Sequence, residues 1–312
     1  MMLLMLTAGT ALVTGAFVYG KRQKKVKRRE LKTRKNDAYG CSFCNKVCFF
    51  AYILQFASVI DRKHQQNVIQ TYQENIEANS EEKLQEMLGE AERYNEMLWQ
   101  TNGVLIGDIE QGILEEESYQ SQLNLSGTGV MGTLSIPKIN VDLPIYHGTE
   151  EEILANGVGH LQESSLPVGG ENTHCILTGH RGLPNAKLFT RLDEMEQGDL
   201  FFLTVCGEKL AYEVTKIEIV HPEDVEGLRI QAEKDLVSLI TCTPYGLNTK
   251  RLVVTGERIP YTEKQEQEIV PGSMSFRELV FTALPFLYLV VGIGSMIRKK
   301  RGKRSSNETQ KD

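Results

Sequence analysis

Hydrophobic and polar residues change their spacing along the chain. From Asp61 to Trp99 apolar residues recur every three or four positions, for example at Leu84 and Leu88, and this is the period of an amphipathic helix. Asn79 or Ser80 is the predicted N-cap within this segment. We expect this helical arm to pack its apolar face on the domain that follows it; the alternative is a coiled-coil partner helix.

The helical period stops at Thr101, and residues 101–127 carry glycines and acidic residues with little periodicity. They predict a loop crossing the domain surface, so residues 61–127 form a helical arm and a lid-like loop. From Val130 to Pro260 short β-rich runs alternate with Gly, Pro, Asn and Asp, which predicts a mainly β fold and a closed antiparallel barrel. The expected strands are Gly132–Ile136, Thr173–Thr178, Leu200–Val205, Ala211–Val220, Leu236–Thr241 and Leu252–Glu257.

Two apolar stretches precede the helical arm, at residues 1–20 and 41–60, and a basic loop at 21–40 separates them. Ten Lys and Arg residues lie between Lys21 and Lys35. A signal peptide carries its charges before its apolar core, so residues 1–20 have the wrong order and are a possible transmembrane segment. The alternative for this segment is a start codon placed too early. Residues 41–60 follow the basic run, as a signal anchor does.

A third apolar stretch covers residues 279–297, after a linker at 263–278, and a basic tail follows at 298–312. Its length is close to that of a membrane-spanning helix, and the basic residues after it act as a stop-transfer signal. If both basic segments are cytoplasmic, residues 61–270 lie outside the cell. The sequence therefore predicts terminal transmembrane helices, a cell-membrane location and an extracellular catalytic domain.

The charge of the part between Asp61 and Val270 differs from that of the whole chain. The chain of 312 residues has a formal net charge of −6 and 41% hydrophobic residues, enough for a substantial core. Between Asp61 and Val270, however, 16 Lys and Arg stand against 36 Asp and Glu, which gives −20. This balance excludes a nucleic-acid partner. The acidic residues form no metal-ligand pattern. We expect them to form a solvated face, with a calcium site as the alternative. No cofactor is expected.

Six cysteines do not form the pattern of a disulfide framework. Cys41, Cys44 and Cys48 fall in or beside an apolar stretch. A zinc site at Cys41 and Cys44 would lack a second pair of ligands. Cys175 and Cys206 are predicted to be inert thiols, with a disulfide between them as the alternative.

The sixth cysteine, Cys242, lies where a predicted strand ends. Turn-forming residues follow at 244–248, and a second strand begins near Leu252. This short connection should place Cys242 and Arg251 side by side across an antiparallel pair. A guanidinium beside a thiol raises the thiolate fraction and can donate hydrogen bonds to an oxyanion.

A thiol nucleophile also needs a proton-transfer partner, and His180 is the candidate. It ends an apolar run just before Gly182 and Pro184, so it too lies at a strand end. The alternatives for the base are four other histidines: His147, His160, His174 and His221. The alternatives for the cation are Arg181 and Arg258. We expect Arg181 to form a structural ion pair.

Three segments carry a resemblance to a known family. Thr-Cys-Thr-Pro-Tyr-Gly at 241–246, Asn-Thr-Lys-Arg-Leu at 248–252 and Leu-Thr-Gly-His-Arg-Gly at 177–182 closely resemble the sortases, cysteine transpeptidases of Gram-positive cell surfaces. The similarity is greatest to class C, the pilin-polymerising branch, and covers roughly residues 129–260. It implies an eight-stranded sortase β-barrel over residues 128–262, with its site at strand ends.

The resemblance also implies the chemistry. Cys242 would attack a carbonyl of a Leu-Pro-x-Thr-Gly-like sorting signal and form a thioacyl enzyme, His180 would act as general acid and base, and Arg251 would stabilise the oxyanion. The acceptor would be a pilin lysine, so the expected partners are pilin subunits and the membrane. The alternatives are a housekeeping sortase that uses a peptidoglycan precursor, a non-catalytic pilus-assembly scaffold, and a cysteine protease that uses water.

One family feature does not match. Class C sortases carry a lid with Asp-Pro followed by Phe or Trp, but the corresponding residues 105–110 contain Asp108 without a proline or an aromatic residue after it. We therefore expect the lid to be absent or to close weakly.

Overall fold

The computed structural model divides the chain into two compact units, each described by itself. One contains Leu54–Ser275, and the other contains Met1–Ile53 with Phe276–Asp312. The predicted segments 1–20, 21–40 and 298–312, and residues 41–59 of the predicted signal anchor, lie outside the described residues. The structure describes residues 60–101, 116–125, 127–182, 188–244, 246–270, 272, 279–280, 283, 286–287 and 290–294.

The predicted apolar stretch at 279–297 is described at ten positions, all of them helical. They include large side chains that are mostly exposed, among them Phe286, Leu287 and Val290. In the part of the chain that the structure describes, no helix combines the length and the apolar character that a membrane crossing requires. The transmembrane segments therefore stay predictions.

Eight strands form a closed barrel in the order β1-β2-β3-β4-β7-β8-β6-β5. The predicted mainly β barrel is thus confirmed, and each of the six expected strands is present. The strands are β1 (Val130–Ile136), β2 (Val141–His147), β3 (Val158–His160), β4 (Thr173–Thr178), β5 (Leu200–Val205), β6 (Glu208–Val220), β7 (Asp235–Thr243) and β8 (Lys250–Ile259).

The expectation of a purely antiparallel barrel is wrong. Strands β2 and β3 pair in parallel, as do β4 and β7. Parallel neighbours need a crossover: the helix α4 (Glu151–Asn156) joins β2 to β3, and the hairpin of β5 and β6 lies between β4 and β7 in the chain. The pattern missed β2, which contains Pro144, and β3, which has only three residues.

Residues on β4, β7 and β8 alternate between the barrel interior and its outer face. Cys175, Val237 and Val254 belong to the large core cluster. Their neighbours Ile176, Ile240 and Val253 form a second, smaller cluster, against which Leu161, Val220 and Leu228 pack. Each of these strands therefore presents one face to the core and one to the elements outside the barrel.

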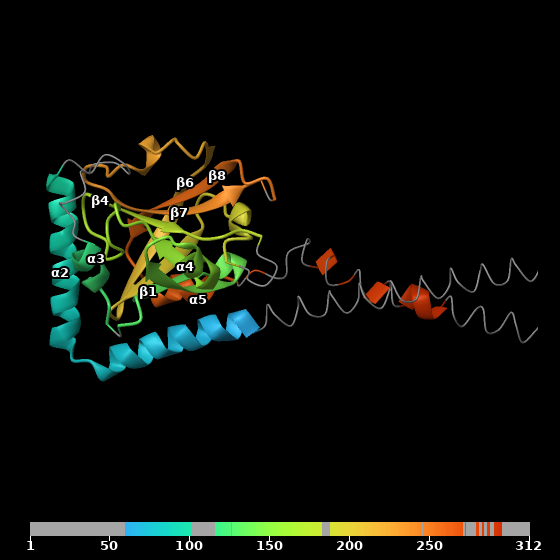
Figure 1. Ribbon diagram of the computed structural model, residues 1–312, viewed down its shortest axis with the longest axis horizontal. Coiled ribbons are helices and arrows are strands. Elements are labelled where there is room, and N and C mark those ends of the chain that lie inside the picture. The colour runs from blue at the N-terminus through green and yellow to red at the C-terminus, as the bar shows by residue number, and fades with distance from the viewer. Residues whose placement is uncertain are drawn as a thin grey trace, which may run out of the picture. The chain divides into compact units, whose positions relative to one another are not determined.

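The predicted helical arm is present as helical residues 60–78 and α2 (Glu81–Gln100). Ser80 is the N-cap of α2 and accepts a hydrogen bond from the backbone N–H of Lys83 at 3.3 Å. Figure 1 shows α2 alongside the barrel. The contact is fixed by the buried Asn95, whose side-chain amide donates to the carbonyl of Leu166 at 3.2 Å and accepts from its N–H at 2.7 Å. The prediction that the arm packs on the following domain is confirmed.

Two segments predicted as loop or linker contain short helices. Within the predicted loop at 101–127, α3 (Glu116–Ser121) is held because Tyr119 is completely buried and its hydroxyl contacts His160 Nδ1 at 2.9 Å. Within the predicted linker, α5 (Glu263–Glu268) is held by an ion pair of Glu266 with Lys209 at 2.7 Å. Tertiary contacts stabilise both helices, which is why local periodicity did not reveal them. Residues 105–110, where a lid motif would lie, are outside the described residues.

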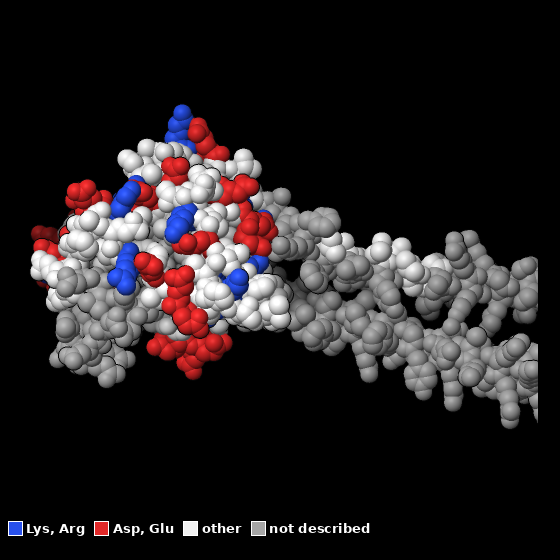
Figure 2. Space-filling view, turned by 90° about the horizontal axis from the view of Figure 1, so that it is seen from above, with Lys and Arg blue, Asp and Glu red and all other residues white. Residues whose placement is uncertain are grey.

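Carboxylates predominate on the face in Figure 2, where red side chains are spread over the surface with fewer blue ones between them. This distribution agrees with the excess of acidic residues counted between Asp61 and Val270. A basic stripe of the kind that binds a phosphate backbone is not visible on that face.

Candidate active site

Strand register places the three predicted catalytic residues in one row. Cys242 on β7 pairs with Arg251 on β8 across the antiparallel ladder, as predicted. On its other side, β7 pairs in parallel with β4, where Thr178 is opposite Ile240. The Gly179 N–H continues this ladder by donating to the Ile240 carbonyl at 3.0 Å. β4 ends at Thr178, but the contacts of Thr241 with Gly179 and of Thr243 with Arg181 keep the two backbones side by side, which places His180 opposite Cys242.

The row lies on the outer face of the barrel. Cys242 has the same parity along β7 as Ile240, which is in the outer cluster, whereas Leu239 is in the core. Cys242 and Arg251 are partly exposed, and the His180 side chain is 24% exposed. A peptide can therefore reach the thiol without opening the core.

The residues on either side of the nucleophile bind the segment that carries His180. Thr241 Oγ1 donates to the Gly179 carbonyl at 2.8 Å. Thr243 Oγ1 accepts from Arg181 Nη1 at 3.3 Å. The sequence alone indicates no role for either threonine. Both contacts depend on the pairing of β4 with β7, which the local sequence does not show. The two threonines hold the segment that carries Cys242 and the segment that carries His180 in a fixed register.

Arg181 forms the predicted structural ion pair. Its Nη2 lies 2.6 Å from Asp193 Oδ2, and the Arg181 side chain is only 5% exposed. Asp193 belongs to the short 3₁₀ helix η2 (Leu192–Glu194). A buried arginine of this kind is expensive to leave unpaired, so Asp193 and Arg181 together fix the position of Thr243.

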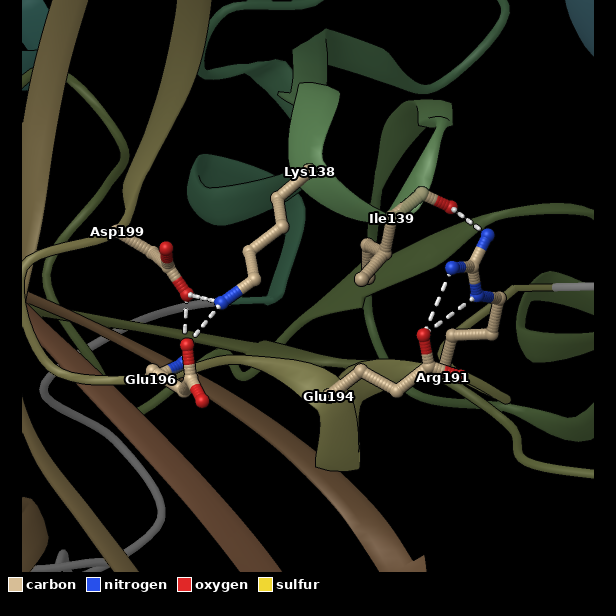
Figure 3. Close-up of polar contacts among 6 residues, drawn as sticks. All are labelled: Lys138, Ile139, Arg191, Glu194, Glu196 and Asp199. Carbon is tan, nitrogen blue, oxygen red and sulfur yellow. Dashed lines mark hydrogen bonds and ion pairs between the residues drawn. The ribbon is translucent and has the colours of Figure 1, made fainter. Parts of the chain in front are cut away.

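Further polar contacts hold the η2 segment on the barrel, as Figure 3 shows. Arg191 contacts Glu194 at 2.7 Å and donates to the Ile139 carbonyl at 3.3 Å. Lys138 contacts both Glu196 and Asp199, at 2.7 and 2.8 Å. Ile139 and Lys138 belong to the 3₁₀ helix η1 (Pro137–Ile139), directly after β1. The contacts that fix Thr243 through Arg181 and Asp193 are thus continued, through the η2 segment, to the residues directly after β1.

Gly179, just before His180, is required by close packing. A Cβ at this position would lie 2.7 Å from Cδ2 of Phe189, which is completely buried. The backbone N–H of Phe189 also donates to the His180 carbonyl at 3.1 Å. The end of β4 is therefore pressed against the core, and this contact fixes the backbone that carries the histidine.

The His180 ring contacts a residue that sequence analysis did not select. Its Nε2 lies 3.2 Å from Oε1 of Glu151, the first residue of α4. The acidic run Glu150-Glu151-Glu152 at the start of a short helix was visible in the sequence, but nothing local indicated that the helix lies beside His180.

Arg251 is held by the loop that precedes it. Its Nη1 donates to the carbonyls of Asn248 and Lys250, at 3.4 and 3.2 Å. A guanidinium has five N–H donors, so these two bonds orient the group and leave donor capacity for an oxyanion beside Cys242. The predicted cross-strand pairing of Cys242 with Arg251 is thus present, and carbonyls of the preceding loop orient the guanidinium.

Three of the four alternative histidines are closed off, whereas the fourth, His221, is exposed directly after β6. His160 is completely buried, contacts the Ser165 carbonyl through Nε2 at 2.8 Å, and burial lowers its pKa to about 4. Burial also lowers the pKa of His147 and of His174. Both ring nitrogens of each contact protein groups. None of these three rings is available to a substrate.

Arg258 is unsuited to act as the cation of the site, and the two other barrel cysteines are unsuited to act as its nucleophile. Arg258 lies over the ring of Tyr212, 5.5 Å from its centroid, at the end of β8 away from Cys242. Cys175 and Cys206 are both free and buried, so the alternative of a disulfide between them is wrong. Burial raises the pKa of Cys175 well above its usual value and that of Cys206 to about 11.

No group of three or more His, Cys, Asp or Glu side chains arranged to hold a metal ion occurs in the described ranges. Cys41 and Cys44, where a zinc site would lack a second pair of ligands, lie outside these ranges. What the site does contain is a cysteine with a histidine and an arginine at neighbouring backbone positions, and these residue types together can perform acyl transfer.

Comparisons with known proteins agree with this geometry. Residues 134–259 match the family model of the sortase domain. The crystal structure of sortase C1 from Streptococcus agalactiae is 40% identical and has a TM-score of 0.58, covering 63% of this chain and 100% of that one. Sortase C from Streptococcus pneumoniae, a structure described with its pilin substrate specificity, is 41% identical with a TM-score of 0.55, covering 63% and 98%.

A curated relative supports the same assignment over a shorter range. Sortase D of Bacillus subtilis (strain 168) is 38% identical over 131 residues, which are 41% of this chain and 63% of that protein. This chain thus spans less than two thirds of the length of that relative. Full coverage of the sortase C1 structure at 40% identity, together with the domain match, shows that the chain belongs to the sortase family of cysteine transpeptidases.

Proposed function

We propose that this protein is a pilin-polymerising sortase that cleaves a Leu-Pro-x-Thr-Gly-like sorting signal and joins it to a lysine amine. The observation that carries this proposal is the row of His180, Cys242 and Arg251 at the ends of the hydrogen-bonded strands β4, β7 and β8, with His180 two residues past the end of β4. The similarity to sortases of class C, one of them described with its pilin specificity, supports the choice of substrate.

The reaction has two acyl transfers. The Cys242 thiolate bonds to the carbonyl carbon of the signal, and the C–N bond to the following residue breaks while His180 gives a proton to the leaving amine. An acceptor amine then attacks the thioester, the C–S bond breaks, and His180 takes a proton from the amine. Arg251 stabilises the oxyanion in both transfers.

The outer apolar cluster supports the peptide. Ile176, Ile240 and Val253 lie on the same face as Cys242, further back along the strands, and are buried. The leucine and proline of a sorting signal would pack on the partly buried side chains that cover this cluster, Leu161, Val220 and Leu228, with the scissile carbonyl over the thiol. Burial of apolar surface then supplies binding energy away from the reacting bond.

A housekeeping sortase is the second candidate, because further curated relatives are named sortase A, for example that of Streptococcus agalactiae at 29% identity. The two candidates differ in the acceptor. The full-length protein should be incubated with a Leu-Pro-x-Thr-Gly peptide and either a lysine-containing pilin peptide or a peptidoglycan-precursor peptide. The proposal expects faster product formation with the lysine side chain, and hydrolysis alone would instead indicate a protease.

We further propose that apolar segments at both ends anchor the protein in the cell membrane with the barrel outside. The apolar stretches at 1–20, 41–60 and 279–297 and the basic clusters beside them support this orientation. Protease added to intact cells should digest the barrel and leave the basic segments protected. Release of the protein by alkaline carbonate would contradict the anchoring.

A further inference from the structure

The ring of His180 has a specific partner outside the row of catalytic residues. Its Nε2 lies 3.2 Å from Oε1 of Glu151. A carboxylate oxygen only accepts hydrogen bonds, so Nε2 carries the proton and donates to Glu151. In the neutral ring the lone pair is then on Nδ1, and Nδ1 is the nitrogen left for the substrate.

Other contacts hold Glu151 in place. It begins α4, in which Leu154 is buried and the N–H of Gly157 donates to the Ile153 carbonyl at 3.0 Å. The carbonyl of Asn156, at the other end of α4, accepts from the buried Gln65 of the N-terminal arm at 3.2 Å. The arm therefore supports the helix that contacts the catalytic histidine.

Other charged groups near His180 have different partners. Glu150 lies over Gly148, where its carboxylate would be the first group met by an added Cβ. Arg181 is paired with Asp193, and Arg251 lies beyond Cys242 in the strand order. Glu151 is thus the carboxylate in contact with the ring among the described residues.

On these grounds we propose that Glu151 is a positioning residue of the sortase reaction: it holds the His180 ring through Nε2 and directs Nδ1 toward the acyl-transfer centre. This inference rests on the proposed function. A third group that orients the base is a common part of nucleophilic catalysis. The Glu151 side chain is 83% exposed, so the ion pair adds little to folding stability, and its loss should affect the reaction without unfolding the protein.

The first test compares Glu151→Gln with Glu152→Gln, which removes the same charge one residue away. We expect Glu151→Gln to lower kcat roughly tenfold with KM within about twofold, since the substrate does not bind the carboxylate. Glu151→Asp keeps the acceptor and should restore kcat in part. Equal kcat values for Glu151→Gln and Glu152→Gln would overturn the proposal.

A second readout does not depend on activity. In the full-length protein with ¹⁵N-labelled histidine, the ring nitrogen signals of neutral His180, assigned with His180→Gln, should place the proton on Nε2 in Glu152→Gln and divide it between Nε2 and Nδ1 in Glu151→Gln. A difference here without any peptide turnover by the wild type would contradict the proposed function and support the positioning role. Identical nitrogen signals in both variants would contradict the positioning role, whether or not the enzyme is active.

Discussion

Two polar clusters occupy the same outer face of β4, β7 and β8, at opposite ends of the strands. One contains His180, Cys242 and Arg251. The other contains His174, whose Nε2 contacts Ser238 Oγ at 2.8 Å, and Thr255, whose hydroxyl lies 2.7 Å from that of Ser238. Each cluster has a histidine on β4 or just past its end, a hydroxyl or thiol from β7 and a polar residue from β8. The cluster of His174, Ser238 and Thr255 is here called the closed cluster.

The closed cluster is buried and its polar groups bind one another. His174 and Ser238 are 1% and 0% exposed, and the second ring nitrogen of His174 contacts the Arg229 carbonyl at 3.0 Å. Cys242 and His180 are instead partly exposed, and the described contacts of Arg251 go to its own loop. The two clusters are alike in residue type and strand neighbourhood. We therefore expect the difference in reactivity to come from solvent access and from donors and acceptors that have no other partner in the site.

The largest expected effect separates the two clusters. Cys242→Ala should lower transpeptidation by more than about 10³-fold because it removes the nucleophile. Ser238→Ala should leave kcat within about threefold and lower the free energy of unfolding by about 1–3 kcal/mol, since the buried His174 loses a hydrogen-bond partner. Peptide turnover and denaturant unfolding measure the two effects. Activity retained by Cys242→Ala would refute the assignment.

Arg251→Ala should reduce kcat by roughly 10²–10³-fold, the usual effect of losing an oxyanion donor. Lys250→Ala is the matched control, because Lys250 pairs with Thr243 and is the preceding residue of the same strand. We expect its kcat to stay within about twofold of wild type. An equal loss in both variants would indicate a general charge effect instead of a specific donor.

The three barrel thiols should differ in reactivity in the native protein. Cys242 is partly exposed, whereas Cys175 and Cys206 are buried with raised pKa values. We expect iodoacetamide to modify Cys242 at least roughly a hundred times faster than either buried thiol. Peptide mapping over time measures the three rates. Comparable rates would show that the interior opens readily and that the contrast in burial does not hold in solution.

The buried histidines predict sensitivity to acid. The unfolded chain protonates His160 below about pH 6.5, but the folded chain does so only near pH 4. Folded protein therefore loses stability as the pH falls through this window, by about 2 kcal/mol at pH 5 from His160 alone. His160→Gln should flatten this dependence, as measured by denaturant unfolding at pH 7 and pH 5. An unchanged slope would show that other groups cause the acid sensitivity.

Sequence predicted the pieces of the fold whose signals are local. The arm, its Ser80 cap and six strands follow from periodicity and turn residues, and the Cys242–Arg251 pair follows from a short connection. Helix α3 and strand β3 were missed because their stability comes from tertiary contacts such as the burial of Tyr119.

The site shows the same division. Cys242, His180 and Arg251 could be selected from their residue types and their places at strand ends. Asp193 and Glu151 could not, because their partners lie 12 and 29 positions away and only the folded barrel brings them together. The parallel pairing of β4 with β7, which aligns His180 with Cys242, is likewise non-local.

The most direct test of the central claim is intact-mass analysis of the full-length protein after incubation with a Leu-Pro-x-Thr-Gly peptide and acid quenching. The account predicts an added mass equal to the acyl fragment, mapped to Cys242, which disappears faster when an acceptor amine is present. An adduct on Cys175 or Cys206, or no adduct while iodoacetamide still modifies Cys242, would contradict it.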